Sequence, residues 1–299
     1  MKTRGLVGAL LLAMAAAQAQ ESNEPLEVLR QRLAERLSSK DEGGLKASPR
    51  ETARAKAAAP ERAESARKPA RATGAWGYAG DVGPDRWAQL SPDNKLCGMG
   101  TRQSPIDIRD GIAVDLERIA FDYRAGGLTV LDSGRAIQVE VEPGSGLSVM
   151  GRRYELQGLS FHRPSEMRIN GRQYEMSVQL LHKDADGRVA IVSVLLERGS
   201  EQPLVQTLLN NLPLERGDPV RVPTPQDPSQ LLPLDRGYYT FYGSLTTPPC
   251  SEGVLWMVLR QPVQLSSQQM AIFQRLYPMN ARPVQPTNGR LIKESLGSP

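Results

Sequence analysis

The segment Gly158–Met167 has the outline of a metal-binding strand but lacks most of the usual ligands. In a β-strand, side chains two positions apart point to the same face, so Ser160 and His162 are expected to face one cavity. A second strand is expected after an Asn170-Gly171 turn, which is of the type that closes a tight hairpin. Pairing of the two strands would bring Gln179 close to Ser160 and His162. The expected site therefore offers one imidazole, one hydroxyl and one amide.

Several longer motifs occur along the chain in a characteristic order. They are Trp76-Gly77-Tyr78, Gln103-Ser104-Pro105-Ile106-Asp107-Ile108, the segment 158–167, Tyr242-Gly243-Ser244-Leu245-Thr246-Thr247-Pro248-Pro249-Cys250 and Asn280-Ala281-Arg282-Pro283-Val284-Gln285-Pro286. On these motifs the chain resembles the α-class carbonic anhydrases over residues 74–293. The resemblance implies a β-rich α+β fold, with a single domain around a large, mostly antiparallel, twisted central sheet and a few short helices.

The resemblance places Ser160, His162 and Gln179 at the positions of the family's three zinc histidines. A catalytic zinc site of this kind has three protein ligands and a water molecule whose pKa falls to ~7. The whole chain has only 2 His, so a site of three imidazoles cannot be built and no bound cofactor is expected. The second histidine, His182, matches a packed histidine of the family and is expected to be a hydrogen-bonded core residue.

The resemblance also indicates changes around the zinc position. Ser177 takes the place of the carboxylate that orients the third histidine, and Arg135 lies near the position of the proton-shuttling histidine. Groups of this kind tune the metal site, so their loss adds to the loss of ligands. Thr246 and Glu166 match the catalytic pair in which the threonine hydroxyl donates to the glutamate, and here they are expected to be vestigial. Water, Arg135, Met167 or a ligand is expected to fill the cavity.

The N-terminus reads as a secretory signal over residues 1–19. Lys2 and Arg4 precede an apolar run over 6–17, and Ala17-Gln18-Ala19 is a small-residue cleavage site. The run is too short to span a bilayer, and no transmembrane segment is expected. The mature protein is therefore expected to be exported, either periplasmic or secreted.

A short amphipathic helix is expected over residues 20–37. Its apolar stripe consists of Leu26, Leu29, Leu33 and Leu37. The stripe has helical spacing and begins just after a proline that suits the first turn of a helix. The pattern fits a solvated helix, a helix that binds an unknown protein partner, or a helix that associates with a second copy of itself. The segment is too short to predict a coiled coil.

A disordered basic tether is expected over residues 38–73, since hardly any large apolar side chain is present there to form a core. Residues 38–75 carry 9 basic and 5 acidic residues, whereas residues 76–299 carry 23 basic and 24 acidic residues. The basic character of the chain thus lies mainly in the tether, and no nucleic-acid surface is expected on the domain, which should span residues 74–295.

Within the domain, short apolar-alternating segments bounded by Gly and Pro predict many strands. Strands are expected at Ala136–Val141, Val189–Leu196 and Val254–Leu259, helices over 203–212 and 266–276, and a proline-rich loop over 219–233. The last two strands are continuously apolar, which is typical of central strands covered on both faces.

Cys97 and Cys250 are the only cysteines of the chain. An even number of cysteines in an exported protein favours a disulfide, and both positions match the usual bridge of the α-carbonic anhydrases. Two reduced core cysteines are the alternative.

The sequence supports two main hypotheses about function. The first is a catalytically silent carbonic anhydrase-like domain that serves as a binding or scaffold module, because a fold by itself does not guarantee its usual chemistry. The alternative is a weak or altered zinc-dependent carbonic anhydrase, active in CO2 hydration, or an esterase. In that case His162, Gln179, Glu166 and Ser160 would hold a metal poorly, since neutral oxygen donors add little affinity. Binding of a small ligand in the vacated cavity is a third possibility.

Overall fold

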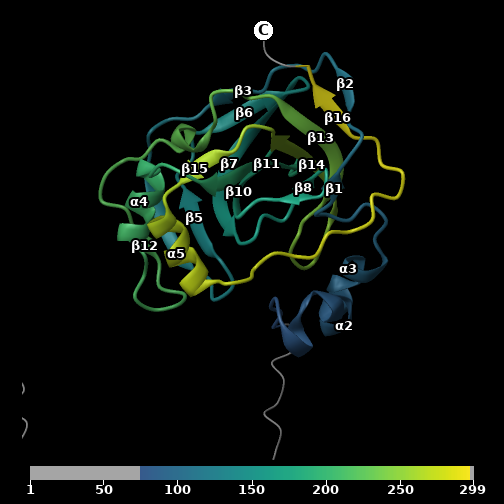
Figure 1. The fold of residues 1–299 in the computed structure, drawn as a ribbon. Helices are drawn as coiled ribbons and strands as arrows, with labels where there is room; N and C mark the ends of the chain where they lie inside the picture. Colours follow the sequence, from purple (N-terminus) through teal and green to yellow (C-terminus); the bar gives the residue numbers. More distant parts are fainter. Residues whose placement is uncertain (1–74, 297–299) are drawn as a thin grey trace, which may run out of the picture. The chain divides into compact units, whose positions relative to one another are not determined.

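The computed structural model describes residues 75–296, and a 13-stranded mixed sheet forms the centre of this part of the chain (Figure 1). The strands of the main path are β12 (Val220–Arg221), β4 (Leu128–Asp132), β5 (Ile137–Val141), β7 (Arg152–His162), β10 (Met176–Lys183), β11 (Val189–Arg198), β14 (Glu252–Leu259), β13 (Tyr238–Ser244), β16 (Lys293–Ser295) and β2 (Ile112–Val114), in that spatial order. Strands β3 (Ala120–Asp122), β6 (Gly146–Val149) and β15 (Val263–Leu265) pair beside this path.

Most neighbouring strands of the sheet are antiparallel. The parallel pairs are β11 with β14, β11 with β15, and β16 with β2. The structure therefore confirms the predicted fold class, with a mixed sheet in which antiparallel pairs dominate.

The register of β7 and β10 decides the geometry of the candidate site. Gln179 pairs with Ser160, and Ser177 pairs with His162. Directly opposed residues of an antiparallel pair point to the same face, so all four side chains lie on one side of the sheet. The predicted juxtaposition of Gln179 with Ser160 and His162 is confirmed.

The predicted Asn170-Gly171 turn is present, but it does not join β7 to β10 directly. It closes the hairpin of β8 (Arg168–Ile169) and β9 (Arg172–Gln173), which forms a separate three-stranded sheet with β1 (Asp107–Ile108). Asn170 and Gly171 both have positive φ, 51° and 79°, as a tight hairpin turn of this kind requires.

The central strands β11 and β14 are buried on both faces, as predicted. Val192 and Val194 belong to a core cluster that includes residues of the helices α4 (Pro203–Asn210) and α5 (Ser267–Leu276). Ile191 and Leu195 pack with Trp256 in a second cluster on the opposite face of the sheet. The cavity described below lies on the face of this second cluster.

Both predicted helices are present. These are α4 (Pro203–Asn210) and α5 (Ser267–Leu276), and Ser266 and Gln269 form a capping box at the start of α5. Four-residue helices α2 (Trp87–Leu90) and α3 (Leu96–Met99) were not predicted, because one turn carries no periodic signal. Short 3-10 turns lie at Gly80–Val82, Pro84–Arg86, Pro92–Asn94 and Pro228–Leu231.

The segment predicted as a loop over 219–233 is partly regular, since it holds β12 and the 3-10 turn Pro228–Leu231. Among the described residues, no helix is long and apolar enough to cross a membrane. The signal predicted over 1–19, the helix over 20–37 and the tether over 38–73 lie outside the described residues.

Candidate functional site

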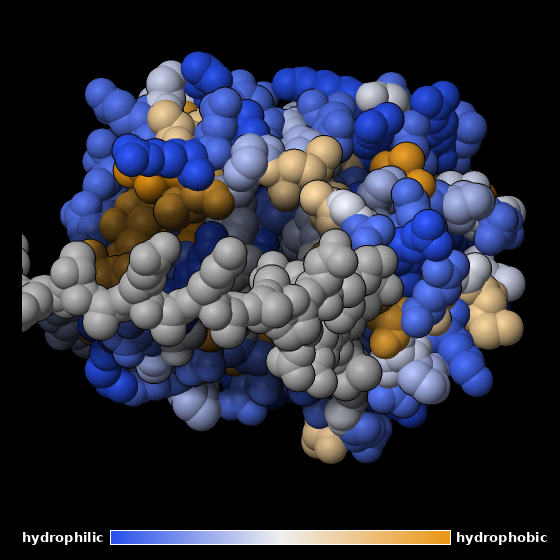
Figure 2. Space-filling model, turned by 90° about the horizontal axis from the view of Figure 1, so that it is seen from below, coloured by the Kyte–Doolittle hydropathy of each residue, from blue (hydrophilic) through white to orange (hydrophobic). Residues whose placement is uncertain are grey.

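A cavity of about 290 Å³ opens on the face of β7 and β10. Its polar side chains include Gln138, Ser160, His162, Gln179 and Thr246, and its apolar ones include Leu181, Ile191 and Leu245. Figure 2 shows a recess on one face of the molecule. Part of its wall is hydrophobic, and the surface around it is hydrophilic. A volume near the lower end of the usual range for ligand pockets suits a small molecule with both polar and apolar parts.

His162 is the only histidine that lines this cavity. Its Nδ1 lies 3.0 Å from the backbone oxygen of Asn280, and its Nε2 lies 3.0 Å from Oγ of Ser160. Because a carbonyl oxygen can only accept, Nδ1 carries the proton of this bond. In the neutral ring Nε2 is then an acceptor, and the Ser160 hydroxyl donates to it.

Asn280 holds the end of β7 in place through several bonds besides the one to His162. Its side-chain amide donates to the backbone oxygen of Phe161 at 2.9 Å, and its side-chain oxygen accepts from the backbone N–H of Arg163 at 2.7 Å. The His162 ring is 3 % exposed. The bonds from Asn280 and the burial of the ring together fix the orientation of the His162 imidazole at the end of β7.

Glu166 is buried beside this histidine. Its carboxylate accepts one hydrogen bond from the side-chain amide of Gln179 and another, at 2.9 Å, from the backbone N–H of Arg282. Oε1 of Glu166 also lies 3.8 Å from Nδ1 of His162. Hydrogen bonds to a carboxylate are about twice as strong as neutral ones, so Gln179 is firmly held with its NH2 group toward Glu166.

The expected bond between Thr246 and Glu166 is not found among the described residues. Thr246 is buried and lines the cavity, but both bonds to the carboxylate come from Gln179 and Arg282. A glutamine at position 179 explains the difference, because its amide supplies the donor that Glu166 needs. Ser177 is also buried, and its hydroxyl has no partner among the described residues.

Of the residues expected to fill the cavity, Arg135 lines it and Met167 does not. The guanidinium of Arg135 lies 4.5 Å from the ring centroid of Trp76, which also lines the cavity. Met167 is fully buried in the second core cluster, and its sulfur accepts from the backbone N–H of Ile106. The suggestion that Met167 occupies the cavity is therefore wrong, because its side chain is part of the packed core.

His182 is a core residue, as predicted. Its Nε2 lies 2.8 Å from the hydroxyl of Tyr123, and the two rings stack. Burial lowers the pKa of His182 to about 3, so the imidazole is neutral in the folded protein at physiological pH.

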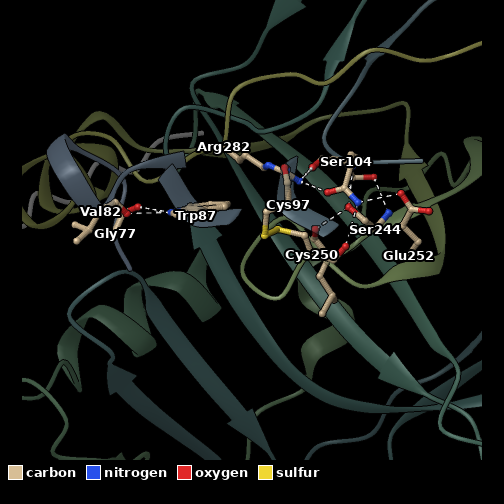
Figure 3. Close-up of a disulfide and its surroundings, with 11 residues drawn as sticks. Gly77, Val82, Trp87, Cys97, Ser104, Ser244, Cys250, Glu252 and Arg282 are labelled. Carbon is tan, nitrogen blue, oxygen red and sulfur yellow. Dashed lines mark hydrogen bonds between the residues drawn. A yellow bond between two sulfur atoms is a disulfide. The ribbon is translucent and has the colours of Figure 1, made fainter. Parts of the chain in front are cut away.

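The predicted disulfide between Cys97 and Cys250 is formed and joins α3 to the loop after β13 (Figure 3). Arg282 lies beside it and donates to the backbone oxygen of Cys97 at 2.8 Å and to that of Ser104 at 2.7 Å. Burial lowers the pKa of Arg282 to about 10, and the nearby carboxylate of Glu166 opposes this effect. The bridge and the guanidinium thus tie the N-terminal helices to the loops next to the cavity.

The sequence profile of eukaryotic-type carbonic anhydrases matches residues 82–296. The chain belongs to the α-carbonic anhydrase family. A carbonic anhydrase of Nostoc sp. is 40% identical over 76% of this chain and 89% of that protein. The structure of the α-carbonic anhydrase from Thermovibrio ammonificans in complex with sulfanilamide has 37% identity and a TM-score of 0.72, and covers 73% of this chain and 98% of that one. Dioscorin complexed with ascorbate has 32% identity and a TM-score of 0.70, and covers 75% of this chain and 100% of that one.

Sequence reasoning missed two residues of this α-carbonic anhydrase site. Asn280 orients His162 through its backbone oxygen, and Arg282 supplies a backbone N–H to Glu166. Both residues stand in a motif that supported the resemblance, but backbone groups carry no residue-type signal. Only the tertiary structure could assign these contacts.

Proposed function

We propose that this α-carbonic anhydrase-like domain does not catalyse zinc-dependent CO2 hydration and acts instead as a binding module. One observation carries the proposal. The three side chains at the expected zinc position are Ser160, His162 and Gln179, and the amide of Gln179 is already bound to Glu166. One imidazole with a neutral hydroxyl and a neutral amide does not fit a zinc site that normally has three strong ligands.

Two other observations support the proposal. The described residues contain no group of three His, Cys, Asp or Glu side chains that could hold a metal ion. Ser177, in place of an orienting carboxylate, has no hydrogen-bond partner among the described residues. A restored ligand at position 179 would therefore lack the group that fixes its ring.

The cavity favours a small ligand with both polar and apolar parts. Its wall combines amides and hydroxyls with Leu181, Ile191 and Leu245, and Arg135 stacks on Trp76 at its edge. Dioscorin, a related protein, has been solved as a complex with ascorbate, which supports binding of a small organic molecule by this fold. An exported location is part of the proposal. The disulfide Cys97–Cys250 and the bacterial relatives support it, as does the predicted signal over 1–19.

The decisive experiment measures zinc content and CO2 hydration of the mature protein after incubation with excess zinc and dialysis. We expect much less than one equivalent of zinc and the uncatalysed rate of hydration. Stoichiometric zinc and a turnover that both disappear in His162→Ala would establish the alternative, a weak zinc-dependent carbonic anhydrase. The Nostoc carbonic anhydrase, treated identically, is the positive control.

A further inference from the structure

Ser160 and His162 have the geometry of a nucleophile and its general base. Oγ of Ser160 lies 3.0 Å from Nε2 of His162, within the range that proton transfer requires, and both side chains line the cavity. The two residues are alternate residues of β7, which is paired on both sides, with β5 and with β10. The relative position of the two side chains is therefore set by one hydrogen-bonded strand and not by a loop.

The imidazole is also oriented by a third group. The backbone oxygen of Asn280 accepts from Nδ1 at 3.0 Å, which leaves the lone pair of Nε2 free to face Ser160. The carboxylate of Glu166 lies 3.8 Å from the same Nδ1 and can stabilise a positive charge on the ring. Ser160 is thus placed as the nucleophile, His162 as its base and the backbone oxygen of Asn280 as the group that orients the base. This arrangement activates a serine hydroxyl.

The cavity supplies the remaining requirements of acyl transfer. Gln138 is the direct neighbour of Ser160 on β5, and its side chain lines the cavity. It can donate to the oxygen of a carbonyl that Ser160 attacks. Leu181, Ile191 and Leu245 form an apolar wall for a short acyl chain.

We propose that Ser160 and His162 form a metal-independent catalytic dyad that hydrolyses small esters of short-chain acids. Oγ of Ser160 attacks the ester carbonyl carbon while its proton passes to Nε2 of His162. The tetrahedral species then collapses, the bond to the alcohol oxygen breaks, and the leaving alcohol takes the proton from His162. Water, deprotonated by the same nitrogen, attacks the acyl-serine and releases the acid, which restores the Ser160 hydroxyl.

The proposal does not depend on how the module binds a partner, and it differs from the zinc chemistry of the α-carbonic anhydrases because no step uses a metal. The alternative role of Ser160 is only to satisfy the buried Nε2 of His162. The two roles differ in one measurable property, which is the reactivity of the serine oxygen.

The test uses a fluorophosphonate, which phosphonylates an activated serine and expels fluoride. The full mature protein, freed of metal with a chelator, is treated with the probe, and the labelled peptide is identified by mass spectrometry. We expect labelling at Ser160 that is lost when the protein is unfolded in urea. The chelator-treated protein should also hydrolyse p-nitrophenyl acetate with a burst of one equivalent or less.

Three variants sharpen the test. Ser160→Ala should abolish labelling and ester hydrolysis, and His162→Gln should slow both by ~10²-fold or more. Ser193→Ala is the matched control, because Ser193 is a buried serine on the same face of the sheet, two strands from Ser160, with no hydrogen-bond partner among the described residues. It should retain the wild-type rates.

Several results would overturn the dyad. These are absence of label at Ser160 in the unaltered protein, equal labelling in His162→Gln, or hydrolysis that survives Ser160→Ala. Mapping of the label on the unaltered protein decides the question even if a variant fails to fold. Ester hydrolysis that vanishes with the chelator and returns with zinc would reject the dyad and the proposed loss of zinc chemistry together, whereas simple inertness would reject the dyad alone.

Discussion

Zinc affinity at the cavity depends on the three side chains at positions 160, 162 and 179. Positions 160 and 179 are direct partners in the β7–β10 pair, and positions 160 and 162 share a strand face. Ser160→His combined with Gln179→His would therefore place three imidazoles around one point. We expect this double variant to take up about one equivalent of zinc, because ligand number and type dominate affinity. Elemental analysis after dialysis measures the uptake.

Activity of the double variant should stay low until Ser177→Glu is added. Ser177 is buried with an unpartnered hydroxyl, so a carboxylate at this position would need the ring at position 179 as its partner. We expect the third change to raise CO2 hydration by ~10 to 100-fold. The same triple variant with His162→Ala is the control. A folded double variant that binds no zinc would show that the cavity has been rebuilt and not merely stripped of ligands.

His182 makes stability depend on pH in a predictable direction. Its pKa is about 3 in the folded protein and ~6.5 when unfolded, so the unfolded chain binds a proton that the folded chain does not between these values. The stability from the neutral, buried ring is present above pH ~6.5 and is lost as the pH falls. We expect the free energy of unfolding to drop by about 2 kcal/mol more between pH 7 and pH 5 in the wild type than in His182→Gln.

Denaturant unfolding at the two pH values tests this expectation. Tyr123→Phe is the matched control, because it removes the 2.8 Å bond to His182 but keeps the titrating ring. It should be less stable than the wild type at both pH values and retain the steeper pH dependence. Identical pH dependence in His182→Gln and the wild type would assign the acid sensitivity to other groups.

The disulfide between Cys97 and Cys250 joins segments 153 residues apart in the sequence. Cross-linking so long a loop restricts the unfolded chain and stabilises the fold by about 4 to 5 kcal/mol in the chain-entropy description. We expect reduction to lower the melting temperature clearly. The combined variant Cys97→Ala with Cys250→Ala, with and without reductant, controls for other effects of the reagent. Peptide mapping that finds two free thiols in exported protein would contradict the bridge.

The family match at residues 82–296 leaves the N-terminal quarter of the chain unexplained. A shortened protein that starts at Thr73 should fold with a melting temperature close to that of the full mature chain, because it keeps the whole family match over residues 82–296 together with the 13-stranded sheet and the three core clusters of the described residues. Calorimetry of both proteins measures the difference. A shortened protein that does not fold would show that the segment packs on the domain.

The stripe of Leu26, Leu29, Leu33 and Leu37 is expected to mediate association of the full chain. A full-length variant with all four leucines changed to serine is the control that separates the stripe from the rest of the tether. We expect it to lose the interactions that the shortened protein also lacks, measured by sedimentation and by capture of partners. Retention of every interaction in both proteins would make the stripe a solvated helix.

The sequence alone determined the fold class, the two longer helices, the central strands and the disulfide. Apolar alternation, the continuous apolar runs at 189–196 and 254–259, and the long motifs can all be recognised within short stretches of sequence. They predict structure correctly because the type of a side chain largely determines whether it is buried in the folded protein. The presence of only 2 His likewise excludes a three-imidazole site by composition alone. None of these conclusions depends on a distance between atoms.

The tertiary structure decided how the side chains of the cavity are partnered. Glu166 is bound by Gln179 and Arg282 instead of Thr246, His162 is oriented by the backbone oxygen of Asn280, and Met167 packs in the core. Each of these contacts joins segments that are distant in the chain or uses a backbone atom. Hydrogen bonds of this kind depend on register and on angstrom-scale placement, which residue types and spacing do not specify. The strand spacing already places Ser160 and His162 on one face, whereas the 3.0 Å contact between the Ser160 hydroxyl and Nε2 of His162 is set by the folded chain.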